Sequence, residues 1–235
     1  MTFRKIRDLL LHRIGMARCF EPRIVFEQPA ARMNCLLELA IARQLLDSRD
    51  FFFLQIGAFD GETRDPLFQA VRKYGLSGVL VEPQLPAFER LRENYKDQPQ
   101  LQFVNAAISD RNEERIMYTR RDGNCTAASF DKQHLLKHSI PEEDIIAQPT
   151  PCLTFQELLK RSGREHVDLL QIDAEGADFA ILKMVDFEHF RPSIVRYEQL
   201  HMSRSERDEA ARRLVQNGYQ IHADRMDVTA IQRAA

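Results

Sequence analysis

The sequence contains no tryptophan, only nine glycines and ten prolines, and no long hydrophobic run. Low contents of glycine and proline argue against a fibrous or disordered chain. No apolar stretch approaches the ~18 residues that a membrane-spanning helix requires, so we expect no integral membrane segment. The 33 basic residues are balanced by 35 acidic ones, which argues against a surface dedicated to nucleic acid. These absences favour a soluble globular protein without a nucleic-acid partner.

The cysteines are scattered and form no C-x-x-C pair; they are Cys19, Cys35, Cys125 and Cys152. This spacing favours reduced thiols over a disulfide framework. The N-terminal segment is basic, but its apolar core at residues 9–11 is too short for a signal peptide, and no small-residue cleavage site follows it. We therefore expect a cytoplasmic protein. A surface helix is the favoured interpretation of the basic segment, and peripheral membrane contact is the alternative.

A length of 235 residues suits one domain with an extension. Residues 1–50 are predicted to form an N-terminal helical extension, and residues 51–235 are predicted to form the main domain. Apolar side chains recur at helical spacing near the end of the extension, at Leu36, Leu37, Ala40, Ile41 and Leu45. This stripe is expected to cover the protein's own core, with a docking face for a partner as the alternative.

From residue 51 onward, short apolar runs alternate with helical segments. Strands are predicted at residues 51–56, 78–82, 101–109, 167–172 and 193–197, and helices at 66–74, 85–95, 154–163, 177–184 and 203–218. The tail is predicted to form two strands around a turn, at residues 219–222 and 228–231. This alternation predicts an α/β fold in which a parallel sheet is covered on both faces.

Local signals mark the starts of three helices. Thr154 with Glu157 has the spacing of a capping box, and so does Ser203 with Glu206. Asp65 is predicted to cap a helix that begins with proline at the next position.

Residues 110–151 lack the alternation of apolar runs and helical segments that the rest of the domain shows. They are polar and are interrupted by Gly123, Pro141, Pro149 and Pro151. A long irregular segment inside a compact domain is usually a lid or a binding loop. We therefore predict that residues 110–151 form a lid or substrate loop.

Carboxylates end nearly every predicted strand. In an open α/β sheet, ligands bind beyond the carboxyl ends of the strands. The acidic residues at these ends are Asp60, Glu82, Asp110, Asp173, Glu175 and Glu198. The sequence thus predicts a binding site with an acidic rim.

The loop after the first strand is G-x-x-x-G rather than the G-x-G-x-x-G of dinucleotide-binding folds, with glycines at Gly57 and Gly61. Asp60, Glu62 and Asp65 crowd this loop and would repel a pyrophosphate, which needs free backbone N–H groups at a helix start. A cofactor that carries a sulfonium and an ammonium would be attracted instead. The alternative for the loop is a plain turn.

Glu82 follows the second strand, some 25 residues after the glycine loop. An acidic residue at that place accepts hydrogen bonds from ribose hydroxyls in nucleotide-binding folds. Taken together with a glycine loop after the first strand, it indicates a cofactor that contains a nucleoside.

The chain resembles the FkbM-type methyltransferase family. The resemblance covers residues 51–231 and rests on Gln-Ile-Gly-Ala-Phe-Asp-Gly at 55–61, Asp-Pro at 65–66, Val-Glu-Pro at 81–83, Asn-Ala-Ala-Ile-Ser-Asp at 105–110 and Asp-Leu-Leu-Gln-Ile-Asp-Ala-Glu-Gly-Ala-Asp at 168–178. It implies a Rossmann-like class I methyltransferase fold, a seven-stranded, mostly parallel sheet with an antiparallel last strand. It also implies S-adenosylmethionine as the cofactor and O-methylation of a hydroxyl on a small molecule or glycan.

The resemblance also implies roles for residues at the strand ends. Gly57, Ala58, Asp60 and Gly61 would hold the methionine part, Glu82 the ribose, and Ala107 and Ile108 the adenine. The full set expected to bind the cofactor is Gln55, Gly57, Ala58, Phe59, Asp60, Gly61, Glu82, Pro83, Ala107, Ile108 and Asp173. Phe59 departs from the family, which usually has a small polar residue there, often asparagine. An aromatic side chain at this place would pack on the cofactor or narrow its pocket.

Three residues are candidates for catalysis. Asp173 and Glu198 end the fourth and fifth strands, so they can face each other across a pocket, and His201 can act as a general base near neutral pH. The alternatives are that His201 is a surface or capping residue, or that the three residues ligate a divalent cation. We assign no metal ligand, and we interpret His134 and His138 as a solvated helix face.

Two further functions remain open. The fold also suits a nucleotide-dependent oxidoreductase, which the acidic loop disfavours, and a non-catalytic module that keeps the pocket for partner recognition. Fold-level analogy does not name the acceptor. Assembly into a homo-oligomer is likewise left open by the sequence.

Overall fold

The computed structural model describes residues 36–47, 50–123 and 126–233. Most of the expected helical extension, residues 1–35, lies outside this range. Helix α2 (Leu36–Asp47) agrees with the apolar stripe at its end, and Leu37 and Ile41 are 1% and 0% exposed. Both pack in one core cluster with Phe51 and Phe53, so the stripe covers the protein's own core. No helix in the described ranges is long and apolar enough to cross a membrane.

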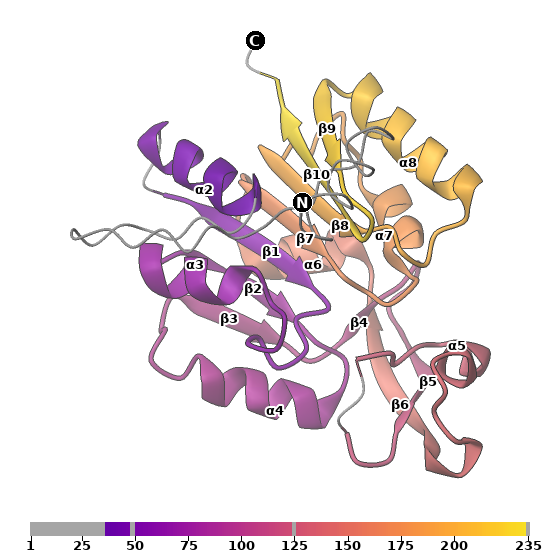
Figure 1. The fold of residues 1–235 in the computed structure, drawn as a ribbon. Coiled ribbons are helices and arrows are strands. Elements are labelled where there is room, and N and C mark those ends of the chain that lie inside the picture. The colour runs from indigo at the N-terminus through magenta and orange to yellow at the C-terminus, as the bar shows by residue number, and fades with distance from the viewer. Residues whose placement is uncertain (1–35, 48–49, 124–125, 234–235) are drawn as a thin grey trace, which may run out of the picture. The chain divides into compact units, whose positions relative to one another are not determined.

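A seven-stranded sheet forms the centre of the described chain (Figure 1). Its strands are β1 (Phe52–Ile56), β2 (Ser77–Val81), β3 (Leu101–Val104), β7 (Leu169–Ile172), β8 (Ile194–Glu198), β9 (Tyr219–Ala223) and β10 (Asp227–Gln232). They lie in the order β3-β2-β1-β7-β8-β10-β9, and β10 runs antiparallel to both of its neighbours. This is the Rossmann-like, seven-stranded and mostly parallel arrangement with an antiparallel last strand that the family resemblance implied.

Helices cover both faces of this sheet (Figure 1). Helices α3 (Leu67–Tyr74) and α4 (Leu85–Asn94) share a core cluster with α2. Helices α6 (Phe155–Ser162), α7 (Asp178–Met184) and α8 (Arg204–Gln216) share the other cluster. Strand β1 serves both clusters, because successive side chains of a strand point to opposite faces. Phe53 joins the first cluster and Leu54 the second, and both are 0% exposed.

The predicted capping signals differ in how completely they form. The Ser203 hydroxyl accepts from the backbone N–H of Glu206 and the Glu206 carboxylate accepts from that of Ser203, which is a full capping box. The Thr154 hydroxyl accepts from the backbone N–H of Glu157 at 3.2 Å, but the Glu157 carboxylate accepts from Arg161 instead. The capping box at Thr154 is therefore only half formed.

The third predicted strand, residues 101–109, is divided in the structure. Strand β3 ends at Val104, and Ala107–Ile108 forms a separate strand, β4, in a second sheet. The Asn105 side chain donates to the carbonyl oxygens of Glu82 and Pro83 at 2.8 and 3.1 Å. These bonds hold the chain where it leaves the large sheet.

Residues 110–151 are not the irregular loop that the sequence predicted. They contain β5 (Glu113–Arg120), α5 (Lys132–Lys137), a 3-10 turn (Glu142–Asp144) and most of β6 (Ile145–Leu153). Among the described residues, β4, β6 and β5 form a three-stranded sheet in that order, with β5 antiparallel to β6. We call residues 109–151 the insertion.

Two prolines in β6 made residues 110–151 look irregular in the sequence. Pro149 and Pro151 lie opposite Ile116 and Glu114 of β5, whereas β4 pairs only with Cys152 and Leu153. Proline has no N–H to donate and is tolerated where a strand has a neighbour on one side only. The prolines therefore occupy the part of β6 that β4 does not reach.

Candidate functional site

A cavity of about 550 Å³ lies at the carboxyl ends of the central strands. That volume is in the range of small-molecule sites. Ten of the residues that we expected at the site line it: Gln55, Gly57, Ala58, Phe59, Glu82, Pro83, Ala107, Ile108, Asp173 and Glu198. The fold thus brings together residues from the ends of five strands.

Three expected residues are not in the cavity lining. Asp60 accepts from the backbone N–H of Thr63 at 2.7 Å and so shapes the loop after β1. Gly61 lies against α4, because a Cβ at this position would come within 2.5 Å of Leu91 Cδ1. His201 lies outside the lining and contacts the cavity residue Glu198.

Gly57 allows the loop after β1 to touch the end of β7. A Cβ at Gly57 would lie 1.8 Å from the backbone oxygen of Asp173, and the backbone φ of +81° is also unfavourable for residues with side chains. Only glycine fits both requirements. The close approach places the backbone of the glycine loop against the backbone of Asp173, and both residues line the cavity.

Glu82 lies at the end of β2 and is 3% exposed. Its Oε2 accepts from the backbone N–H of Phe59 at 2.8 Å, and its Oε1 accepts from that of Gln84 at 2.9 Å. Burial raises the pKa of the carboxyl to about 7, although these hydrogen bonds oppose the shift. Glu82 therefore joins the glycine loop to the second strand at the cavity wall.

Phe59, the departure from the family pattern, adopts a backbone φ of +49°. This left-handed region favours glycine and asparagine among the natural residues, which accounts physically for the asparagine that the family pattern has there. The Phe59 ring lines the cavity, and the Arg90 guanidinium lies 5.4 Å from its centre.

Carboxyl groups around the cavity repel one another. Burial, together with neighbouring acids, raises the pKa of Asp65 to about 7 and those of Glu175 and Glu198 to about 8. Asp173 is exposed to the cavity, and desolvation there, with the charge of Asp227, raises its pKa as well. Arginines that line the cavity, Arg64, Arg115 and Arg196, do not cancel these shifts. The site is therefore short of positive charge.

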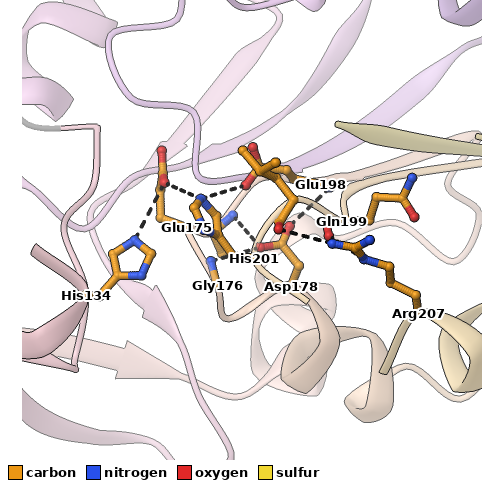
Figure 2. Close-up of polar contacts among 10 residues, drawn as sticks. His134, Glu175, Gly176, Asp178, Glu198, Gln199, His201 and Arg207 are labelled. Carbon is orange, nitrogen blue, oxygen red and sulfur yellow. Dashed lines mark hydrogen bonds and ion pairs between the residues drawn. The ribbon is translucent and has the colours of Figure 1, made fainter. Parts of the chain in front are cut away.

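Asp178 accepts hydrogen bonds from three backbone N–H groups at the acidic end of the cavity (Figure 2). One oxygen accepts from the backbone N–H groups of Ala174 and Gly176, and the other accepts from that of Glu198, each at 3.3 Å. The sequence indicates Asp178 only as the end of a motif and as an acidic residue at the start of a helix. Its bond to Glu198 joins the loop after β7 to the end of β8, and no local pattern could have revealed it.

Four side chains next to the cavity form what we call the histidine cluster: His134, His138, Glu175 and His201. Figure 2 shows His134, Glu175 and His201 pointing toward one another. Glu175 Oε2 lies 3.9 Å from His134 Nε2 and 3.5 Å from His201 Nε2. Desolvation and the neighbouring histidines lower the pKa of His134 to about 4. The interpretation as a solvated face without acidic partners was wrong for His134, whose side chain lies against Glu175 and His201, whereas the His138 side chain is exposed.

The insertion supplies the wall opposite the glycine loop. Several of its residues, none of them indicated by a sequence pattern, line the cavity: Arg115, Met117, Ser129, Phe130 and Asp131. The Arg115 guanidinium lies 4.2 Å from the centre of the Phe130 ring. A segment interpreted as irregular offered no pattern from which these residues could be selected.

Comparison with known proteins gives one family. The model of the methyltransferase FkbM domain matches residues 55–221 of this chain. No curated protein matches the sequence.

Solved methyltransferase structures are similar at low identity. One is the methyltransferase FkbM from Methylobacillus flagellatus KT, with 14% identity, coverage of 77% of this chain and 44% of that chain, and a TM-score of 0.49. Another is an O-methyltransferase from Bacillus cereus in complex with SAH, with 11% identity, coverage of 87% and 84%, and a TM-score of 0.43. A third, a putative RNA methyltransferase from Pyrococcus horikoshii, has 13% identity, coverage of 98% and 96%, and a TM-score of 0.43. Similarity at this level transfers no substrate to this chain.

Proposed function

Because the chain belongs to the methyltransferase FkbM domain family, we propose that it transfers a methyl group from S-adenosylmethionine to a hydroxyl oxygen of a small molecule or glycan. The observation that carries the proposal is the position of Glu82, buried beside the glycine loop in a cavity at the strand ends. A carboxylate there can accept from ribose hydroxyls. The absence of a basic excess supports an acceptor other than nucleic acid.

The charges of the cavity suit this cofactor. A sulfonium and an ammonium are attracted to carboxyl groups whose pKa values, raised chiefly by burial and also by neighbouring acids, fall again when a cation binds beside them. The buried oxygens Gln55 Oε1 and Gln171 Oε1 have no hydrogen-bond partner among the described residues, and both side chains line the cavity. Such acceptors suit an ammonium group. A pyrophosphate would meet the same acidic wall and be repelled.

Individual residues then take distinct roles in holding the cofactor. Of the four residues that the family resemblance implies for the methionine part, Gly57 and Ala58 line the cavity and would hold it, whereas Asp60 and Gly61 lie outside the lining. Ala107 and Ile108, which are 6% and 5% exposed, offer an apolar surface for the adenine. When bound, S-adenosylmethionine supplies the methyl group.

Methyl transfer to an oxygen needs an acceptor held in line and a base that removes its proton. We assign the base to Glu198, which lines the cavity and whose pKa, raised to about 8 mainly by desolvation, suits proton transfer near neutral pH. Its Oε2 is buried and has no hydrogen-bond partner among the described residues. Asp173 faces the same cavity and would orient the acceptor. His201 Nε2, at 3.5 Å from Glu198 Oε2, acts through Glu198 as a positioning residue.

Calorimetric titration with S-adenosylhomocysteine, S-adenosylmethionine and NAD tests the cofactor. We expect micromolar binding of the first two and none of NAD, whereas binding of NAD alone would instead support an oxidoreductase. Isotope-labelled S-adenosylmethionine with a panel of sugars, small alcohols and RNA then tests the acceptor. Labelling of RNA would contradict the proposed acceptor class, and tight cofactor binding without transfer to any acceptor would favour a non-catalytic module.

The cellular setting is part of the proposal. Cys152 is a free and buried thiol, which supports a reducing, cytoplasmic environment. Light scattering of the purified protein would show whether it forms a homo-oligomer.

A further inference from the structure

The histidine cluster lies beside the cavity, which its member Glu175 lines, and none of its residues is among those proposed to hold the methyl donor. Its ligand atoms all lie within 4.8 Å of one another. We propose that the histidine cluster binds one divalent transition-metal ion of the Zn²⁺ type, and that this ion fastens α5 to the ends of β7 and β8.

The distances suit a single ion. Zn–N and Zn–O bonds of about 2.0–2.2 Å place neighbouring ligand atoms of a tetrahedral site about 3.4 Å apart. Glu175 Oε2 lies 3.5 Å from His201 Nε2 and 3.9 Å from His134 Nε2. The His134 and His138 rings, one helical turn apart on α5, have centres separated by 4.6 Å. Small side-chain rotations therefore bring the donors to ligand spacing.

Two buried polar atoms in this place have no hydrogen-bond partner among the described residues: His134 Nε2 and Glu198 Oε2. The Glu198 side chain is only 10% exposed, and its Oε2 lies 3.5 Å from His201 Nε2. Buried polar groups without partners are costly, and each one in a native protein requires an explanation. An ion bound between these side chains explains both atoms, because it would bind the His134 nitrogen and attract the Glu198 carboxylate.

The donor set indicates the kind of metal. Three imidazoles and one carboxylate suit Zn²⁺ and similar transition metals, whereas Mg²⁺ and Ca²⁺ prefer sites made entirely of oxygen. Four protein ligands are typical of a structural zinc site, since a catalytic site usually keeps one position for water. The exposed His138 side chain leaves a path for the ion to enter.

A second group in the described chain, Asp186, Glu188 and His189, also gathers potential ligands. All three of its side chains are exposed, and the His189 ring nitrogen is already paired with Asp186 at 2.9 Å. No buried atom there is without a partner in the described residues. This exposed group therefore serves as an internal control for the histidine cluster.

An ion in the cluster would join parts of the chain that are distant in sequence. His134 and His138 lie on α5 in the insertion, Glu175 follows β7, and His201 follows β8. Ser129 and Phe130, just before α5, line the cavity. Fixing α5 therefore fixes the wall that the insertion gives to the cavity.

The test uses the full chain without a polyhistidine tag. The protein is stripped with a chelator and titrated with Co²⁺, which reports tetrahedral coordination by its visible absorption, and Zn²⁺ is then added as a competitor. We expect one Co²⁺ per chain and its displacement by one equivalent of Zn²⁺. A stripped, folded wild-type chain that shows no stoichiometric tetrahedral Co²⁺ signal overturns the proposal without any variant.

Variants locate the ion. The double variant His134→Ala/His138→Ala removes two ligands from the surface of α5 and is expected to weaken Zn²⁺ binding by at least about 100-fold. Glu175→Gln keeps the side-chain shape and is also expected to weaken binding. The matched control His189→Ala should leave binding unchanged. Binding that survives in the double variant, or that is lost in the control, places the ion elsewhere and contradicts the proposal.

Hydrogen exchange tests whether the ion fastens α5. Adding Zn²⁺ to the stripped wild-type chain should slow amide exchange in residues 131–138, and it should have no such effect in the double variant. Equal exchange with and without bound Zn²⁺ contradicts the fastening role. Neither measurement needs methyl donor or acceptor, so their outcome is independent of the proposed methyltransferase activity.

Discussion

The Glu82 carboxylate accepts a hydrogen bond of 2.8 Å from the backbone N–H of Phe59, a residue 23 positions earlier in the chain. This bond joins the end of β2 to the loop after β1. The same carboxylate lines the cavity where the ribose of the cofactor is proposed to bind. One side chain thus has both a structural and a binding role, and variants can separate the two.

Glu82→Gln is expected to weaken S-adenosylhomocysteine binding by at least about tenfold, because it loses a charge-assisted hydrogen bond. Its single amide oxygen can accept from only one of the backbone N–H groups of Phe59 and Gln84, so the melting temperature should fall moderately. Glu82→Ala is expected to weaken binding similarly and to lower the melting temperature further, because it keeps neither bond. Calorimetry and thermal unfolding measure the two effects, with the exposed Glu89→Gln on α4 as the control. Unchanged affinity in both Glu82 variants would remove this residue from the site.

Gly57→Ala is expected to destabilise the fold by more than about 1 kcal/mol and to abolish cofactor binding. Its Cβ would lie 1.8 Å from the Asp173 backbone oxygen, so the loop or the end of β7 must move. Gly163→Ala is the matched control, because that glycine also has a positive φ, of +65°, but nothing lies within 4 Å of an added Cβ. Denaturant unfolding compares the two. Equal destabilisation would show that backbone strain alone, and not the contact with β7, requires glycine at 57.

The stability of the protein without cofactor or metal should fall as pH rises from about 7 to 8 and should level off above that range. Glu175 and Glu198 have folded-state pKa values raised to about 8, chiefly by burial, against 4.5 when unfolded. The folded state therefore holds protons that the unfolded state has released, and their stabilisation is lost as pH rises through 8. The free energy of unfolding falls by up to about 1.4 kcal/mol per pH unit for each such proton.

Urea unfolding at several pH values measures this slope. Glu175→Gln and Glu198→Gln should each flatten it, because glutamine does not titrate. The histidines with lowered pKa values, His134 and His201, are neutral throughout this range and do not contribute. A wild-type slope of zero or of opposite sign would contradict the raised pKa values.

Binding of S-adenosylmethionine near pH 7 is expected to release protons. A bound cation lowers the pKa of nearby carboxyl groups, and those of Asp65 and Glu198 lie near 7 and 8 before binding. Affinity should therefore increase with pH over this range. Calorimetry in two buffers with different ionisation enthalpies counts the protons, and Glu198→Gln should reduce the count. Proton uptake on binding would contradict the proposed placement of the positive charges.

Asp173→Asn is expected to reduce methyl transfer much more than cofactor binding. The amide preserves the shape of the side chain beside Gly57 but removes the charge that would orient the acceptor. Single-turnover transfer and calorimetry separate the two effects. A variant with wild-type turnover would remove Asp173 from the chemistry. Asp60→Asn is the comparison, because that carboxylate is near the same loop but outside the cavity lining.

The large sheet could be predicted because its strands are buried on both faces. Strand β1 is uniformly buried, and such strands appear in sequence as short apolar runs between helices. The glycine loop and Glu82 followed from the same argument, because residues at the carboxyl ends of parallel strands meet at one edge. These parts of the site could be predicted because they depend only on the local sequence pattern and on the order of the strands along the chain.

The insertion and the histidine cluster could not be predicted in this way. In β5, Met117 is buried but Glu113 and Glu114 are exposed, so the strand carries too little apolar pattern to be recognised. The contact between His134 and His201 depends on the path of the chain through residues 135–200. Sequence spacing on α5 showed that His134 and His138 share a face but not what this face meets.

The insertion begins and ends at neighbouring points. Ala107 pairs with Cys152 and Ile108 with Leu153 in parallel register, and the Ser109 N–H donates to the Leu153 carbonyl oxygen at 2.9 Å. Loop-closure entropy increases only slowly with length, so a segment whose ends are held together can be exchanged for a longer or shorter one at small cost. Chimeras joined at residues 108 and 152 would therefore carry a new cavity wall on an unchanged sheet. The fold thus separates the strand ends, where the methyl donor is proposed to bind, from a part that can be replaced to suit another acceptor.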